Sequence, residues 1–108
     1  MDNIQEIDAL TLKKQIDNHA NIELIDVREE FEIEICKIKD STHIPMNQIP
    51  NHLKGLDINK NLIIICKSGV RSYHVCQFLH EQGFKNIYNL KGGIINWALE
   101  VDDSLELY

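Results

Sequence analysis

The chain has 108 residues, enough for one compact domain and too few for two ordinary ones, so residues 1–108 are expected to form a single domain. Acidic residues outnumber basic ones by 17 to 11, and the formal net charge of −6 disfavours a nucleic acid as partner. The longest apolar run, Leu62–Cys66, is far shorter than the ~20 residues that cross a bilayer. The first residues also lack the basic and apolar segments of a signal peptide. The sequence therefore predicts a soluble, cytoplasmic protein without a membrane partner.

The hydrophobic pattern alternates between strand and helix along the chain. Residues 22–27 (IELIDV) and 61–66 (NLIIIC) are short and rich in β-branched residues. Both their odd-numbered and their even-numbered positions carry apolar residues, as expected of strands covered on both faces. The first half of the chain is expected to form a weak strand at 4–7, a helix carrying Leu12 and Ile16, the strand 22–27, and a helix carrying Phe31 and Ile35. A weak strand at 42–44 and a short helical piece between Pro45 and Leu53 should then lead to the strand 61–66. After it we expect a helix over 72–82 that stops at Gly83, a weak strand at 86–90 and a final helix after residues 91–93. This order predicts an α/β fold around a central, mostly parallel β-sheet.

The cysteines and histidines give no metal signature. Cys36, Cys66 and Cys76 are an odd number without C-x-x-C spacing, so free thiols are expected. The five histidines show no H-E-x-x-H and no paired spacing with cysteine. The sequence therefore predicts neither a metal site nor a cofactor.

Cys66 ends the strongest strand candidate, where open α/β sheets usually bind ligands. The loop that follows is expected to turn its N–H groups and a helix N-terminus toward the Cys66 sulfur, and amides with adjacent cations favour the reactive thiolate. A loop that curls around an anion commonly needs a residue with positive φ, which Gly69 can supply. Cys66 is therefore the candidate nucleophile, although most free cysteines are simply small buried residues. The candidate substrate-binding residues are Lys67, Ser68, Gly69, Val70, Arg71 and Ser72.

The two cations of this segment each have two interpretations. Lys67 could attract an anionic substrate or be solvated and idle. Arg71 could clamp an anion or bind a neighbouring carboxylate, and the five donors of a guanidinium allow both roles.

Asp26 and Arg28 follow the strand 22–27, so they should reach the same edge of the sheet as Cys66. We expect Asp26 to be a buried structural carboxylate rather than a general acid, since buried charges need partners. Its expected partner is Arg28 or Arg71. Both residues are thus predicted to support the site.

Four other positions carry weaker expectations. Cys76 has helical spacing with the core and should be buried, whereas Cys36 is either buried or a resolving thiol. His43 is expected to be a structural imidazole, and His74 lies in the first turns of the helix after Cys66. Gly92–Gly93 should form a tight turn.

Four segments, in this order along the chain, match motifs of one family. They are LIDVREEFE (24–32), IPMNQIP (44–50), CKSGVRS (66–72) and NLKGGIINWA (89–98). The third resembles C-x-x-G-x-R-S, the active-site loop of rhodanese-like domains. The others resemble that family's first motif, its I-P-[LM] segment and its L-x-G-G-x-x-x-W ending.

The resemblance implies helices on both faces of a central parallel sheet, and sulfur transfer as the activity. Cys66 would take a sulfur atom from thiosulfate or a protein persulfide and pass it to a thiol acceptor or cyanide. Residues 36–41 depart from the G-H-I-P-G-A of many members and are similar to a variant fused to enzymes that load sulfur carriers. A sulfur-carrier protein is therefore a possible acceptor.

Two other functions remain open at this stage. A cysteine-dependent phosphatase or arsenate reductase uses similar loop chemistry, but such phosphatases resemble C-x-x-x-x-x-R, and only four residues separate Cys66 from Arg71. A non-catalytic protein-interaction module on the same fold would typically lose the nucleophile, whereas Cys66, Gly69 and Arg71 are all present.

Overall fold

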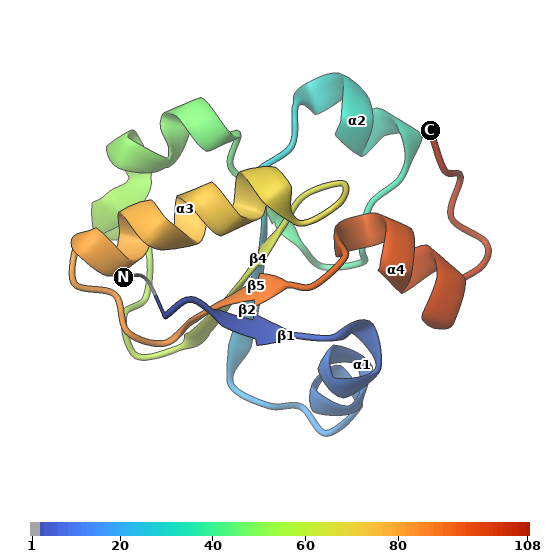
Figure 1. Ribbon diagram of the computed structural model, residues 1–108, viewed down its shortest axis with the longest axis horizontal. Coiled ribbons are helices and arrows are strands. Elements are labelled where there is room, and N and C mark those ends of the chain that lie inside the picture. The colour runs from blue at the N-terminus through green and yellow to red at the C-terminus, as the bar shows by residue number, and fades with distance from the viewer. Residues whose placement is uncertain (1–2) are drawn as a thin grey trace.

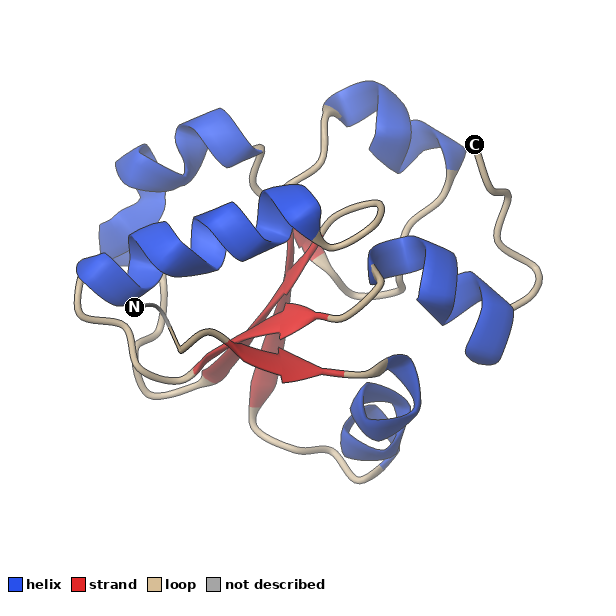
Figure 2. Cartoon of the chain, in the orientation of Figure 1, coloured by secondary structure: helices blue, strands red, loops and turns tan. Residues whose placement is uncertain are grey.

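The computed structural model describes residues 3–108 and has a five-stranded parallel β-sheet at its centre (Figure 1). The strands are β1 (Gln5–Ile7), β2 (Ile22–Asp26), β3 (Thr42–His43), β4 (Asn61–Ile65) and β5 (Ile87–Leu90), and their order in the sheet is β1-β5-β4-β2-β3. The helices are α1 (Ala9–Asp17), α2 (Glu30–Ile35), the 3₁₀ helix η1 (Met46–Gly55), α3 (Val70–Glu81) and α4 (Gly93–Glu100). Helices lie on both sides of the strands, which confirms the predicted α/β class (Figure 2). Among these described helices, none has the length and apolar composition needed to cross a membrane.

The two strands with the clearest sequence signal are neighbours in the middle of the sheet. β2 and β4 pair in parallel from Ile22 opposite Asn61 to Asp26 opposite Ile65. Residues 62–65 of β4 are at most 1% exposed, and successive side chains point to opposite faces of the sheet. One set packs in a core with α3 and η1, and the other packs in a core with α1 and α4. Fully burying each such aliphatic side chain contributes roughly 1.5–3 kcal/mol to stability.

Most element boundaries lie within one residue of the predicted ones, and three differences are worth describing. β4 ends at Ile65, so Cys66 is the first residue of the following loop. α3 begins at Val70 rather than Ser72, because Gly69 takes a left-handed conformation (φ 97°) at the N-cap and lets the helix start sooner. The piece expected to end at Leu53 is a ten-residue 3₁₀ helix that continues to Gly55.

The parallel order brings the carboxyl ends of β2, β4 and β5 to one edge of the sheet. The amide of Val27 donates to the carbonyl of Ile65 (2.9 Å), which joins the segments leaving β2 and β4. The amide of Ile94, in the first turn of α4 after β5, donates to the carbonyl of Cys66 (3.0 Å). The predicted functional residues therefore gather at this edge.

Candidate active site

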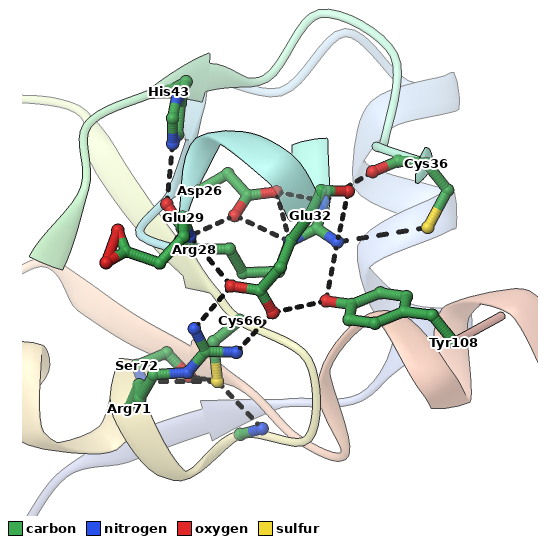
Figure 3. Close-up of polar contacts among 11 residues, drawn as sticks. Asp26, Arg28, Glu29, Glu32, Cys36, His43, Cys66, Arg71, Ser72 and Tyr108 are labelled. Carbon is green, nitrogen blue, oxygen red and sulfur yellow. Dashed lines mark hydrogen bonds and ion pairs between the residues drawn. The ribbon is translucent and has the colours of Figure 1, made fainter. Parts of the chain in front are cut away.

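The sulfur of Cys66 is the point on which the loop after β4 converges (Figure 3). The amide of Gly69 donates to Cys66 Sγ at 3.1 Å and the amide of Ser72 at 3.4 Å, while Ser72 Oγ lies 3.2 Å away. Cys66 is 1% exposed, so these contacts form out of water. Hydrogen bonds to a charged acceptor are stronger than neutral ones, so the two amides would bind a charged sulfur more strongly than a neutral one. The predicted convergence of loop and helix amides on Cys66 is confirmed.

The other predicted loop residues do not donate to the sulfur. Of the residues that the structure describes, Gly69 and Ser72 supply the amide contacts to Cys66 Sγ. Ser68 is exposed and Val70 is 61% exposed, so both face solvent at the rim of the loop. Lys67 is half-buried and places its Nζ 4.3 Å from the centroid of the Tyr108 ring. Direct substrate contacts by these three residues stay predictions.

Gly93 lets the Cys66 loop and the start of α4 pack backbone to backbone. Gly93 has φ 60°, and a Cβ there would lie 2.6 Å from the carbonyl oxygen of Cys66 and closer still to that of Lys67. Because no Cβ occupies this space, the amides of Ile94 and Ile95 can donate to the carbonyls of Cys66 and Lys67, at 3.0 and 3.1 Å. The tight turn predicted at Gly92–Gly93 is present, and it also anchors the loop that begins at Cys66.

Asn89 is a buried polar residue that the sequence analysis missed. It is 1% exposed in β5, and its Nδ2 donates to the carbonyl of Gly69 and to Glu6 Oε2, both at 3.0 Å. These bonds fix the amide so that Oδ1 accepts the Ser72 hydroxyl at 2.5 Å. In this arrangement the one hydroxyl hydrogen of Ser72 is bound to Asn89, so the donors that point at Cys66 Sγ are the amides of Gly69 and Ser72. The signal that could have identified Asn89 in the sequence is a single asparagine within the otherwise apolar segment IYNL (87–90).

Arg71 is held by a carboxylate from α2. Its Nη1 and Nη2 donate to Glu32 Oε2 and Oε1 at 2.7 and 2.8 Å, and the Glu32 side chain is 5% exposed. The Arg71 bonds, with help from Tyr108 and a backbone amide, lower the pKa of Glu32 from 4.5 to about 2. The bond to Glu32 in turn raises the pKa of Arg71. The expected contact of Arg71 with a carboxylate is therefore confirmed, while its role as an anion clamp stays a prediction.

Asp26 and Arg28 form a fully buried ion pair at the end of β2. Both are 0% exposed, and the guanidinium donates to Asp26 from Nε (3.0 and 3.1 Å) and from Nη2 (2.9 Å). Arg28 Nη2 also donates to the carbonyl of Cys36 at 2.7 Å, which ties β2 to the end of α2. Burial acts to lower the pKa of Arg28, but the bonds to Asp26 and Tyr108 raise it above its usual value. The partner of Asp26 is thus Arg28 and not Arg71.

Tyr108 joins these two ion pairs, and no motif of the sequence includes it. Its hydroxyl donates to Glu32 Oε1 at 2.6 Å and accepts a hydrogen bond from Arg28 Nη1 at 3.0 Å (Figure 3). Burial and the bond to Glu32 raise the pKa of Tyr108, so the phenol keeps the proton that it donates. The carboxylate of Glu32 therefore binds Arg71 and Tyr108 at once.

The remaining candidates are Cys36, Cys76 and His43, and none of the described hydrogen bonds to the Cys66 sulfur comes from them. Cys36 Sγ contacts Arg28 Nη1 at 3.9 Å, and Cys36 packs in the core with α1 and α4, whereas Cys66 belongs to the core with α3 and η1. Burial raises the pKa of Cys76 to about 12, so this thiol is an inert core residue as predicted. His43 Nε2 contacts the carbonyl of Arg28 at 2.6 Å, which confirms its structural role.

A surface pocket of about 320 Å³ adjoins the Arg71 side of the site. It is lined by Val27, Glu29, Met46, Asn47 and Arg71. Arg71 is the cation that faces it, with a side chain that is 36% exposed. Among residues 3–108, no three or more His, Cys, Asp or Glu side chains gather as metal ligands.

Known proteins share this fold and align along most of this chain. Residues 8–100 match the rhodanese-like domain family. A Bacillus subtilis (strain 168) protein, provisionally named as the sulfurtransferase YtwF, is 43% identical over 97 residues, which are 90% of this chain and 93% of that one. Thiosulfate sulfurtransferase GlpE of Coxiella burnetii is 33% identical over 94 residues, 87% of this chain and 84% of that one. The crystal structure of a rhodanese-like domain protein from Staphylococcus aureus superimposes with a TM-score of 0.84 at 30% identity, covering 97% of this chain and 99% of that one. The chain belongs to the rhodanese-like domain family.

Proposed function

We propose that this protein, as one rhodanese-like domain, is a sulfurtransferase whose nucleophile is Cys66. The observation that carries the proposal is the pair of amides, from Gly69 and Ser72, that point at a sulfur with 1% exposure. Amides that solvate an anion in place of water stabilise a thiolate before the reaction and a persulfide after it. The sulfurtransferase names of relatives that align along most of the chain support the same reaction class.

The reaction has two steps with Cys66 as the covalent carrier. In the first, the Cys66 thiolate attacks the outer sulfur of thiosulfate, the S–S bond breaks, and sulfite leaves with the electron pair. In the second, an acceptor thiolate or cyanide attacks the terminal sulfur of the Cys66 persulfide and regenerates the thiolate. Splitting the transfer in this way is covalent catalysis by an activated nucleophile.

We propose thiosulfate or a protein persulfide as the donor and a thiol or sulfur-carrier protein as the acceptor. Lys67 and Arg71 are the cations that would attract an anionic donor, and Ser68 and Val70 would form the rim that it passes. Asp26 and Arg28 would support the site by fixing the end of β2. The three free cysteines are consistent with a reducing, cytoplasmic location.

A steady-state assay tests this proposal against the phosphatase and arsenate reductase alternative. The protein is incubated with thiosulfate and cyanide, and in parallel with an aryl phosphate or with arsenate and a thiol. We expect thiocyanate formation that is lost in Cys66→Ser and kept in Cys76→Ser, with no phosphate release. Phosphate release or arsenate reduction that depends on Cys66 would replace the proposed function. An intact protein that is inert toward all donors would favour a binding module.

A further inference from the structure

The hydroxyl of Tyr108 is bound by two charged groups on different segments. It donates to Glu32 of α2 at 2.6 Å and accepts from Arg28, just after β2, at 3.0 Å. Arg28 and Glu32 are buried, so their positions are set by the core and by their own ion pairs. Charge-assisted hydrogen bonds of this kind are roughly twice as strong as neutral ones. The aromatic ring of Tyr108 is therefore held in one place beside the Cys66 loop.

The ring of Tyr108 carries the ammonium group of Lys67. Lys67 Nζ lies 4.3 Å from the ring centroid, well within the ~6 Å over which a cation is attracted to an aromatic face. A lysine side chain is a compact charge on a long flexible stem, so a free Lys67 would spread its charge over a wide volume of solvent. The ring contact confines that charge over Tyr108, whose hydroxyl binds the same Glu32 carboxylate that holds Arg71.

The geometry points to Tyr108 as a positioning residue that sets the preference of the Cys66 site for anionic sulfur donors, because its fixed ring holds in one place the ammonium group of Lys67, the residue next to Cys66 in the chain. This inference rests on the proposed sulfurtransferase function and names its donor class as small anions, such as thiosulfate, over neutral sulfur compounds. A fixed positive charge raises the local concentration of anions and does not change that of neutral molecules. The effect of Tyr108 should therefore depend on the charge of the reagent and on Lys67.

The preference can be measured without any sulfur transfer, from the rates at which iodoacetate and iodoacetamide alkylate Cys66. Peptide mass spectrometry assigns the label to Cys66, and the ratio of the anionic to the neutral reagent reports the local charge. We expect Tyr108→Leu and Lys67→Gln each to lower this ratio about two- to fivefold, the range that a cation–π contact implies. Tyr108→Phe keeps the ring and should lower the ratio less. Lys85→Gln, at the opposite edge of the sheet before β5, is the matched control for loss of one positive charge.

A double-mutant cycle separates positioning from a general loss of structure. In the Lys67→Gln background, Tyr108→Leu should lower the ratio much less than in the wild type, because no ammonium group is left to position and only the hydroxyl bonds to Glu32 and Arg28 are lost. An equal drop in both backgrounds, or no drop in Tyr108→Leu alone, would overturn the role of Tyr108. If Tyr108→Phe lowered the alkylation ratio as much as Tyr108→Leu does, the ring would not be what holds Lys67. That result would also overturn the proposed role of Tyr108. Thermal unfolding of each variant shows that the folded protein is being compared.

Thiosulfate kinetics distinguish this inference from the proposed function. With turnover present, Tyr108→Leu should raise KM for thiosulfate about two- to fivefold while kcat changes little. If the alkylation ratio shifts as expected and the wild type still neither turns over thiosulfate nor forms a persulfide, the proposed function fails and the role of Tyr108 stands. If the wild type transfers sulfur and neither KM nor the ratio responds to Tyr108, the function stands and this inference is wrong.

Discussion

Both carboxylate oxygens of Glu32 bind the guanidinium of Arg71, at 2.7 and 2.8 Å, although the two residues are 39 positions apart in the chain. This pair links α2 to the first turn of α3, directly after the Cys66 loop. A bidentate pair fixes orientation as well as distance. Arg71 is therefore oriented by the protein before any anion arrives.

Glu32→Gln should destabilise the protein by on the order of 2 kcal/mol at neutral pH, less than for a fully buried pair because the Arg71 side chain is 36% exposed. The pKa of Glu32 falls from 4.5 to about 2 on folding, so the stabilisation from its charge is complete above 4.5 and is lost as the pH falls toward 2. Urea unfolding at a series of pH values measures this. The difference between wild type and variant should shrink between pH 4.5 and 2, and a difference that grows there would contradict the assignment.

Asp26→Ala should damage folding more than chemistry. It leaves the guanidinium of Arg28 buried without its carboxylate, and breaking a buried pair in this way costs roughly 3–5 kcal/mol. Denaturant unfolding gives the loss of stability, and thiocyanate formation per folded molecule gives the chemistry. A variant as stable as the wild type but inactive would mean that Asp26 takes part in the reaction.

Gly93→Ala should disturb the Cys66 loop because the new Cβ would overlap the carbonyls of Cys66 and Lys67 at a position with φ 60°. We expect a loss of stability of about 1–3 kcal/mol and a larger loss of sulfur transfer. Gly55→Ala is the matched control, since a Cβ at Gly55 would meet no atom within 4 Å. Equal effects of the two substitutions on unfolding and on turnover would show that the contact of α4 with the loop is unimportant.

Asn89→Leu should loosen the loop from the side of β5. It removes the acceptor of the Ser72 hydroxyl and the donor to the Gly69 carbonyl, both at buried or part-buried positions. An unpaired buried polar group costs about 1–3 kcal/mol, which a melting curve would detect. Thiocyanate formation should also fall, because the Gly69 amide would point less steadily at Cys66. Full activity with normal stability would exclude Asn89 from positioning the loop.

The features that local sequence determines were predictable. β2 and β4 carry apolar residues on both faces of the sheet, and Cys66, Gly69 and Arg71 lie close together in the chain, so their arrangement follows from one strand-to-helix turn. The earlier start of α3 at Val70 depends on the φ of a single glycine, which the helical spacing alone did not reveal. The local pattern therefore placed Cys66 and the amides that contact its sulfur at one turn, with an error of two residues in the start of α3.

The partners of these residues were not predictable, because they come from distant segments. Glu32 lies in the run REEFEIE, where several carboxylates compete and only the tertiary packing of α2 selects one for Arg71. Asn89 accepts a hydrogen bond from Ser72, 17 positions away in the chain. Tyr108 donates a hydrogen bond to Glu32, 76 positions away. No periodicity encodes such contacts, so they required the folded chain.

Intact mass spectrometry of the protein after incubation with thiosulfate tests the central claim most directly. If the amides of Gly69 and Ser72 hold Cys66 as a sulfur-accepting thiolate, the wild type should gain the mass of one sulfur atom and lose it on addition of cyanide. Cys66→Ser should gain nothing, while Cys36→Ser and Cys76→Ser should gain one sulfur. A wild type that gains no sulfur from thiosulfate or from a persulfide donor, or a gain that persists in Cys66→Ser, would contradict the account.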